Sequence, residues 1–450
     1  MHLIIAGGVA AGTKAAARAR RVNPDIAITL YQDESVVSYS ACGQPYWLSG
    51  VIPSRESLII RRASDFEADG IDVRLRHRVS SLNTQARIVQ VHDLDHDRLE
   101  TAHFDRLILA TGARPVIPAI PGIELDGVVT LRTMVELDRF RSALDRLQPK
   151  SAVIAGGGYI GLEVAESLQA LGVAVTIVER LERLFPRLDP EMGQRVHDHL
   201  TGQGVRVALG EGMVEMIENE GRVATVVTAS GRQLPADLVV LAIGIRPNIE
   251  LAEQAGIALG STGAIAVDPR METNVNGVFA AGDCAESYHR LTGAPVWGPL
   301  GDIANLQGRV AGENAAGGDA RFPGILGTAI FKTFDLNIGL TGLTEATARE
   351  AGLSPVATVI SAQDKARYYP GAQELTVKLI AESGSGRLLG AQAVGLGAVD
   401  KMIDIAATAL LGGLSCRDLE NADLAYAPPF SPVLSPIIIA ASTLSRKLSV

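Results

Sequence analysis

A single cysteine near the N-terminus, Cys42, has the surroundings of a reactive thiol. It stands just before Gly43, Gln44 and Pro45, and proline is a favoured residue in the first turn of a helix. A helix N-terminus lowers a thiol pKa from near 8.5 to about 3.5–7.5. Cys42 would then be a thiolate at neutral pH that attacks a disulfide or a peroxide. The alternative is a small buried apolar side chain, because free cysteines are often buried.

The other two cysteines, Cys284 and Cys416, lie too far along the chain to form a CxxC or CxxxxC pair with Cys42. We expect Cys284 in the core and Cys416, which sits in a polar stretch, on the surface. A lone redox thiol stores its oxidised state as a mixed disulfide, a persulfide or a sulfenate.

Tyrosine is the candidate acid in the last part of the chain, since no histidine follows His289. Tyr368 and Tyr426 stand in proline-bordered loops, RYYPG and AYAPPF. A phenol can donate a proton to a leaving thiolate. The alternative reading is that both rings pack these loops.

Two glycine-rich turns, in residues 3–12 and 152–161, each join an apolar strand to an Ala-rich helix. The N-terminus of such a helix suits a pyrophosphate. We expect coenzyme contacts from Gly7, Gly8, Ala10 and Gly12 at the first turn and from Gly156, Gly158, Tyr159, Ile160 and Gly161 at the second. Lys14 and Glu163, in the following helices, are expected to have orientation roles at most. Two such turns suggest two nucleotides that meet, as in hydride transfer from a nicotinamide to a flavin.

The chain also repeats a second pattern in residues 104–115 and 236–247. Each segment is an Asp-led apolar strand that ends in Ala-x-Gly-x-Arg-Pro, which indicates duplication of a whole domain. Ala110, Thr111, Gly112 and Gly244 are the expected coenzyme contacts of these segments.

The second turn has all three glycines, and the strand that follows its helix ends in Glu179. An acid about 20 residues on accepts hydrogen bonds from a ribose 2′-hydroxyl and repels a 2′-phosphate, so NADH is favoured and NADPH is the alternative. Arg180 and Arg183 partly offset that repulsion.

The first turn has Val9 in place of the middle glycine, and its second strand ends in Gln32 and Asp33, which are the expected coenzyme contacts at that strand end. A later strand, residues 277–283, ends in Gly-Asp. Asp283 is expected to contact a flavin through its ribityl chain or the adjacent phosphates. The alternative is a turn aspartate that caps the next helix.

Composition is that of a soluble globular protein: 450 residues, 47% hydrophobic, 20% charged, 47 glycines. The net charge of −9 argues against a nucleic-acid or anionic-membrane surface. No apolar run of about 18 residues and no signal peptide is found. With 3 cysteines, a reducing, cytoplasmic location is expected. No metal site is predicted.

The predicted fold class is α/β, with two Rossmann-like dinucleotide-binding domains, for FAD and NAD, and a C-terminal α+β dimerisation domain. We assign residues 1–112 and 246–325 to the FAD-binding domain, 113–245 to the NAD(P)-binding domain, and 326–450 to the C-terminal domain. In the last we expect strands over 375–380 and 388–394 and a helix from Asp400 to Leu411.

With these motifs in place, the whole chain resembles the single-cysteine pyridine nucleotide-disulfide oxidoreductases, and within them the coenzyme A disulfide reductases and NADH-dependent persulfide reductases. The resemblance implies a homodimer with one FAD per subunit, in which Tyr368 and Tyr426 act in trans on the sulfur at Cys42. Matching positions imply that Arg21, Ser38, Asn305 and Arg309 hold coenzyme A.

Departures from the family pattern bear on coenzyme A as the substrate. Ala41 replaces an asparagine, Gln44 replaces a leucine, and Lys365 replaces a histidine. A phosphate-binding lysine is missing from residues 67–70.

The predicted function is thus NAD(P)H-dependent, flavin-mediated reduction of a disulfide, persulfide or polysulfide through Cys42. One alternative is an NADH oxidase or peroxidase with a cysteine sulfenate, although Val9, Ala10 and Ala11 stand where that branch usually has a histidine. The other is a non-enzymatic FAD/NAD redox sensor.

Overall fold

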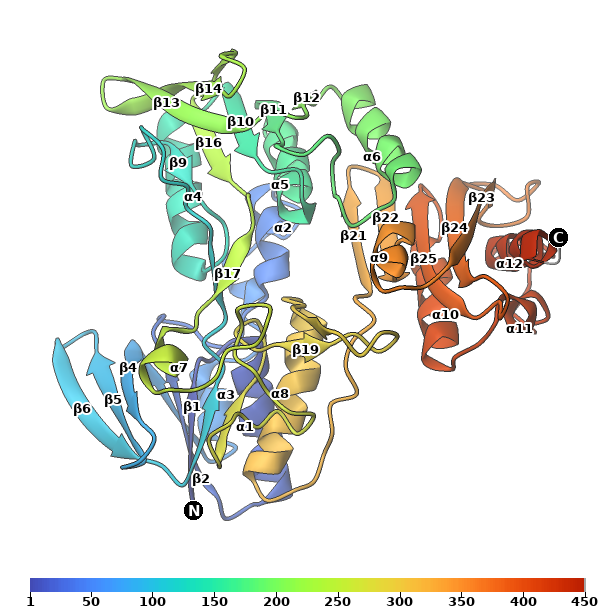
Figure 1. The fold of residues 1–450 in the computed structure, drawn as a ribbon. Coiled ribbons are helices and arrows are strands. Elements are labelled where there is room, and N and C mark those ends of the chain that lie inside the picture. Colours follow the sequence, from blue (N-terminus) through green and yellow to red (C-terminus); the bar gives the residue numbers. More distant parts are fainter. Residues whose placement is uncertain (449–450) are drawn as a thin grey trace. The chain divides into compact units, whose positions relative to one another are not determined.

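The structure is a computed structural model that describes residues 1–448. The chain forms two compact units, each assembled from separate stretches of sequence (Figure 1). One unit holds residues 1–117, 129–148 and 244–325, and the other holds 118–128, 149–243 and the chain from 326 onward. The division into three domains given above stays a prediction.

A five-stranded parallel sheet forms the centre of the first unit. Its strand order is β18 (Val278–Ala280), β7 (Arg106–Leu109), β1 (His2–Ala6), β2 (Ala27–Gln32) and β3 (Ile71–Leu75). The four strands other than β3 are largely buried along their length, as expected where a parallel sheet is covered on both faces, whereas the edge strand β3 alternates buried and exposed residues. Strand β18 pairs with β7, so residues 278–280 lie in the same sheet as strands from the first half of the chain.

Two helices of this unit, α1 (Ala10–Val22) and α8 (Gly301–Ala315), pack side by side (Figure 1). A Cβ atom on Gly308 would lie 2.3 Å from the backbone oxygen of Ala11, and one on Gly312 would lie 2.2 Å from that of Ala15. Only glycine at these two positions allows the helices to approach so closely.

Further elements complete the first unit. They are the helices α2 (Gln44–Leu48), α3 (Ala63–Glu67), α4 (Met134–Leu147) and α7 (Glu250–Gln254), the 3₁₀ turns η1 (Ala41–Gly43) and η2 (Arg55–Leu58), an antiparallel sheet of β4 (His77–Asn83), β5 (Ile88–Asp93) and β6 (Arg98–His103), and the pairs β8 (Ala113–Pro115) with β17 (Ile245–Pro247) and β19 (Ser287–Tyr288) with β20 (Pro295–Val296).

The second unit contains a sheet built on the same plan. Its order is β12 (Arg206–Ala208), β11 (Ala174–Val178), β10 (Ser151–Ala155), β16 (Leu238–Leu241) and β9 (Val128–Val129). The pairs β10–β11, β10–β16 and β11–β12 are parallel. Helices α5 (Tyr159–Ala170) and α6 (Pro190–Gly202) accompany this sheet, with a small antiparallel sheet of β13 (Met213–Asn219), β14 (Arg222–Thr228) and β15 (Gln233–Pro235).

The C-terminal part of this unit is a five-stranded antiparallel sheet. Its order is β21 (Ala329–Thr333), β22 (Leu336–Gly342), β25 (Leu388–Gly395), β24 (Glu374–Glu382) and β23 (Pro355–Gln363). The helices are α9 (Glu345–Glu350), α10 (Val399–Leu411), α11 (Cys416–Glu420) and α12 (Pro436–Leu448).

These elements confirm the predicted strands around 375–380 and 388–394, the helix ending at Leu411, and the α/β fold class with an antiparallel C-terminal sheet. The expectation that Cys416 lies on the surface is wrong. Cys416 begins α11 and is 3% exposed, because the short helix packs its first turn against α12. Between residues 1 and 448, no helix has the length and apolar character needed to cross a membrane.

Candidate active site

Cys42 lies in the 3₁₀ turn η1, and its side chain is exposed. The predicted helix follows as α2, with Pro45 in its first turn. This helix has only 5 residues. Because a helix dipole is the sum of its peptide dipoles, α2 favours a thiolate less than a longer helix would.

Backbone hydrogen bonds connect residues 37–43, which we call the cysteine loop, to the first glycine turn. The N–H of Ser38 donates to the carbonyl oxygen of Gly8 at 2.8 Å, and the N–H of Ile60 donates to that of Ser38 at 2.7 Å. Ser38 has a left-handed backbone, with φ of +52°, which is uncommon for a residue other than glycine. The chain therefore bends sharply between the glycine turn and Cys42.

A buried carboxylate, Glu34, also supports this loop, and the sequence analysis missed it. Its Oε2 accepts a 2.5 Å hydrogen bond from the Tyr39 hydroxyl, and its Oε1 accepts one of 2.9 Å from the N–H of Met134 at the start of α4. Burial raises the pKa of Glu34, and burial together with the charge of Glu34 raises that of Tyr39. The only local signal was an acid two residues after the end of a buried strand.

The first glycine turn has the geometry of a nucleotide-binding turn. Gly7 has φ of +110°, and a Cβ there would lie 2.0 Å from the Ala110 oxygen. A Cβ on Gly12 would lie 1.8 Å from the Gly7 oxygen. Strand, turn and helix can therefore meet only through glycine at both positions.

Gln32 and Asp33, at the end of β2, were both predicted to contact the coenzyme, and in the structure their side chains point in different directions. The side-chain oxygen of Gln32 accepts a 2.8 Å hydrogen bond from the N–H of Gly8. Asp33 points elsewhere: its carboxylate is 44% exposed and lies 3.3 Å from the Arg78 guanidinium. Gln32 is therefore the residue that faces the turn.

The second turn repeats this geometry around an acid. Gly156 has φ of +108°, and its Cβ would lie 2.2 Å from the Ala242 oxygen. The N–H of Gly157 donates to Glu179 at 2.7 Å. A Cβ on Gly158 would meet nothing within 4 Å, so this position leaves room for a ligand. Glu179 lies where the sequence places it, at the end of β11.

The helix α5 begins at this second turn with the predicted coenzyme contacts Tyr159 and Ile160 and continues through Gly161 and Glu163. The Tyr159 ring centre lies 6.3 Å from that of Phe331, on β21. Strand β21 therefore lies beside the start of the helix.

The two repeated Ala-x-Gly-x-Arg-Pro segments also have matching conformations. Gly112 and Gly244 have φ of +69° and +113°, and an added Cβ at either would meet nothing within 4 Å. Beside Gly112, the Thr111 hydroxyl donates to the carbonyl oxygen of Asn248 at 2.7 Å. Both segments thus form left-handed turns with free space next to them.

Asp283 follows β18 and is mostly buried. Its carboxylate pairs with the guanidinium of Arg132, and its carbonyl oxygen accepts a 2.9 Å hydrogen bond from the Trp297 indole. Sequence reasoning did not single out Arg132, which lies 151 residues away. The neighbouring thiol, Cys284, is 0% exposed, and burial raises its pKa, which confirms its place in the core.

The positions predicted to hold coenzyme A fall on the packed helix pair and the cysteine loop. Arg21 lies at the exposed end of α1, while Asn305 and Arg309 lie one turn apart on the exposed face of α8. The Asn305 amide donates to the Gly301 oxygen at 2.8 Å. Ser38 is in the cysteine loop described above.

Tyr368 and Tyr426 come together on the surface of the second unit. They are 77% and 49% exposed. A hydrogen bond with Tyr368 raises the pKa of Tyr426. The N–H of Ala366 donates to the Pro428 oxygen at 3.3 Å, which joins the two loops. Cys42 belongs to the first unit, so the approach of these phenols to Cys42 stays a prediction.

Comparison with known proteins identifies the family. Residues 1–297 match the model for pyridine nucleotide-disulphide oxidoreductases, and residues 328–436 match that family's dimerisation domain. An NAD(P)H sulfur oxidoreductase (CoA-dependent) of Pyrococcus abyssi is 40% identical over 98% of both chains. An NADH oxidase of Methanocaldococcus jannaschii is 36% identical over 100% of both.

The solved structures include an NAD-dependent persulfide reductase from A. fulgidus. It is 40% identical, with a TM-score of 0.96, over 100% of this chain and 84% of that one. The chain therefore belongs to the pyridine nucleotide-disulphide oxidoreductase family and is an enzyme among its NAD(P)H-dependent flavoprotein reductases.

Proposed function

We propose that this enzyme uses NAD(P)H to reduce a disulfide, persulfide or polysulfide, of the coenzyme A type, at Cys42. The observation that carries this proposal is the exposed thiol on a loop whose backbone is bonded to the first glycine turn, from Ser38 to Gly8. Cys284 and Cys416 are 0% and 3% exposed, so Cys42 is the only cysteine of the chain open to a large substrate.

The residues present fit two nucleotides. The turn at Gly7 and Gly8, with Gln32 beside it, would hold the pyrophosphate side of FAD, and the turn at Gly156 to Gly158, with Glu179 beside it, would hold NADH. The left-handed turn with free space at Gly112, in the same unit as the first glycine turn, supports the FAD assignment. When bound, the two coenzymes would supply two electrons to the sulfur at Cys42.

The sulfur chemistry belongs to the protein. The Cys42 thiolate attacks one sulfur of the substrate's S–S bond, forms a new S–S bond to it, and releases the other sulfur as a thiolate. Tyr426 donates a proton to that thiolate, and its hydrogen bond with Tyr368 orients the phenol. Two electrons and one proton then break the mixed disulfide, which releases a second thiol and restores the Cys42 thiolate, and a second proton from solvent restores the Tyr426 hydroxyl.

A homodimer is part of the proposal, because the C-terminal part matches a dimerisation domain and the two phenols stand on its surface. Arg21 and Arg309 offer positive charge on α1 and α8, which suits the phosphates of coenzyme A. The P. abyssi relative is named as CoA-dependent, which supports the same substrate class.

Oxygen reduction is the second candidate, since the M. jannaschii relative is named as an NADH oxidase. In that case Cys42 would cycle through a sulfenate, the product of thiolate attack on a peroxide.

The experiment is an anaerobic assay of NADH oxidation with coenzyme A disulfide, coenzyme A persulfide and polysulfide, each with the wild type, Cys42→Ser and the control Cys416→Ser. We expect sulfur-dependent turnover in the wild type and the control only. Mass spectrometry of Cys42 should then show coenzyme A or an added sulfur. Equal sulfur turnover in Cys42→Ser would refute the role of the thiol. In a parallel aerobic assay without a sulfur substrate, NADH oxidation together with an added oxygen on Cys42 would favour the oxidase.

A further inference from the structure

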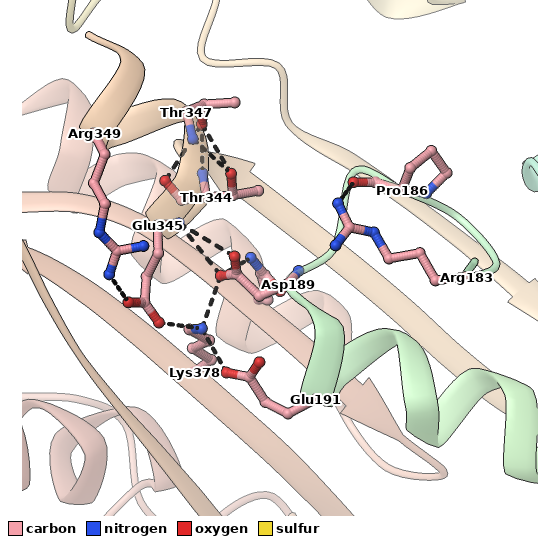
Figure 2. Close-up of polar contacts among 10 residues, drawn as sticks. Arg183, Pro186, Asp189, Glu191, Thr344, Glu345, Thr347, Arg349 and Lys378 are labelled. Carbon is pink, nitrogen blue, oxygen red and sulfur yellow. Dashed lines mark hydrogen bonds and ion pairs between the residues drawn. The ribbon is translucent and has the colours of Figure 1, made fainter. Parts of the chain in front are cut away.

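A buried lysine joins the C-terminal sheet to the start of α6 (Figure 2). The side chain of Lys378, on β24, is 1% exposed. Its ammonium lies 2.8 Å from Asp189, 2.5 Å from Glu191 and 2.7 Å from Glu345. Although burial alone lowers the pKa of Lys378, the hydrogen bonds of these carboxylates outweigh it, so its pKa is raised and the lysine is charged.

Asp189 is the most enclosed of the three carboxylates, with a side chain 5% exposed. Its backbone N–H donates to the Gln392 side-chain oxygen at 2.9 Å, and the Gln392 amide donates back to its carboxylate at 2.8 Å. The N–H of Glu345, at the start of α9, adds a weaker contact at 3.3 Å. The C-terminal sheet thus fixes both the main chain and the side chain of Asp189.

Asp189 ends the loop of residues 180–189, which we call the selectivity loop. This loop leaves the sheet directly after Glu179 and carries Arg180 and Arg183. It also touches the second glycine turn, because the N–H of Phe185 donates to the carbonyl oxygen of Gly157 at 2.9 Å. Its position therefore bears directly on the groups that would face the adenosine ribose.

The C-terminal part holds this loop at two further points. The Phe185 ring centre lies 4.8 Å from that of Phe331, edge to face. The Arg187 guanidinium donates to the carbonyl oxygen of Gly327 at 2.7 Å. Phe185 itself has φ of +45°, a left-handed conformation that a bulky residue keeps only where its surroundings enforce it.

Within the anchored loop, Arg183 is turned back on its own chain: its guanidinium donates to the Pro186 oxygen at 3.4 Å (Figure 2). In that position the guanidinium contacts the main chain of its own loop. A released loop would free Arg183 to meet a 2′-phosphate, which guanidinium groups bind well.

We propose that Lys378 is a positioning residue for coenzyme selectivity. By fixing Asp189 it keeps the selectivity loop in the conformation in which Glu179 faces the ribose and Arg183 stays folded back, so that NADH is preferred over NADPH. This inference rests on the nicotinamide site of the proposed function, but it does not depend on the sulfur chemistry at Cys42.

The test measures binding of ADP-ribose and of its 2′-phosphate by titration calorimetry, which needs neither flavin turnover nor a sulfur substrate. We expect the wild type to prefer ADP-ribose and Lys378→Met to lose about tenfold of that preference. The double variant Lys378→Met/Arg183→Met should lose the affinity for the 2′-phosphate that Lys378→Met gained. Arg183→Met alone should bind the 2′-phosphate about as well as the wild type does. If Lys378 only stabilised the fold, Arg183→Met would change the affinity for the 2′-phosphate equally in the wild type and in Lys378→Met.

The matched control is Lys332→Met. Lys332 is a second lysine of the C-terminal sheet that pairs with an acid of the nucleotide-binding part, Glu166 on α5, at 2.6 Å, but it makes no contact with the selectivity loop among its hydrogen bonds and ion pairs. Its variant should keep the wild-type ratio of the two dissociation constants.

Loss of Lys378 leaves three carboxylates near one another, so the variant's fold must be checked by circular dichroism and thermal unfolding. Asp189→Asn is the milder variant, because it removes the charge that Lys378 binds on the selectivity loop and keeps the lysine with Glu191 and Glu345; it decides the question where Lys378→Met does not fold. An unchanged ratio in folded Lys378→Met or, failing that, in Asp189→Asn overturns the proposal. A wild type that binds neither ligand overturns the nicotinamide site as well, whereas lost sulfur reduction with an intact binding ratio would count against the proposed function alone.

Discussion

The backbone N–H of Gly157 donates a 2.7 Å hydrogen bond to the carboxylate of Glu179. The first half of the chain repeats this contact with an amide in place of the acid, from Gly8 to Gln32 at 2.8 Å. The same hydrogen bond therefore occurs in both turns, but its acceptor is charged only in the second.

The charge of Glu179 should set the preference for NADH. Glu179→Gln keeps an acceptor for Gly157, as Gln32 does for Gly8, but it no longer repels a 2′-phosphate. We expect the ratio of kcat/KM for NADH to that for NADPH to fall about tenfold, or ~1.4 kcal/mol. Asp33→Asn, at the matching strand end of the first half, is the control and should leave the ratio unchanged. A Glu179→Gln enzyme with the wild-type ratio would show that the acid does not select the coenzyme.

Alanine substitutions at two glycines of the second turn should affect different properties, stability at Gly156 and coenzyme binding at Gly158. Gly156→Ala places a Cβ 2.2 Å from the Ala242 oxygen at φ of +108°, so it should lower the free energy of unfolding by more than about 2 kcal/mol. Gly158→Ala points its methyl group into free space, so stability should stay within about 0.5 kcal/mol while NADH binding weakens. Denaturant unfolding and NADH titration separate the two effects, and equal losses of stability would contradict the assignment.

Glu34 should make stability depend on pH. Burial raises its pKa in the folded state, so the folded protein holds this proton more tightly than the unfolded chain does. Its contribution is fully present below about pH 4.3, the ordinary pKa of glutamate, and is lost as the pH rises through the folded pKa.

Glu34→Gln, which cannot ionise, should therefore gain stability relative to the wild type as the pH rises from about 4.3 toward neutrality. Thermal unfolding of both proteins across that range is the measurement. Parallel pH profiles would mean that Glu34 ionises no less readily in the folded protein.

The subunit boundary can be tested by complementation. If Tyr426 serves the partner's Cys42, then Cys42→Ser and Tyr426→Phe subunits, each impaired alone, should recover part of their activity as heterodimers. In such a heterodimer one of the two sites has both residues intact. Verified heterodimers without recovered turnover would place the tyrosine in cis or outside the reaction.

The sequence was sufficient to predict the features that depend on local pattern. Gly7, Gly12, Gly156 and Gly161 occupy positions where any side chain would strike the backbone, so the motif and the geometry follow from the same steric requirement. The C-terminal strands β24 and β25 were equally readable, because apolar runs flank a glycine-serine turn.

Contacts between distant residues could not be predicted in this way. Arg132 forms an ion pair with Asp283, 151 positions away, and Lys378 forms one with Asp189 at a similarly large separation in the sequence. No local spacing therefore predicts either pair. The prediction that Cys416 is exposed was wrong for a related reason. The residues that follow it are polar, but its burial depends on the packing of α11 on α12. Local composition describes a segment, whereas burial depends on what covers it.

The glycine contacts between α1 and α8 have an evolutionary consequence. Gly308 and Gly312 tolerate no side chain, so random mutagenesis should find both positions intolerant. Asn305 and Arg309, on the exposed face of the same helix, carry no such constraint. If Asn305 and Arg309 hold coenzyme A as proposed, replacements at these two positions should change the affinity for the substrate while the helix pair beneath them stays fixed.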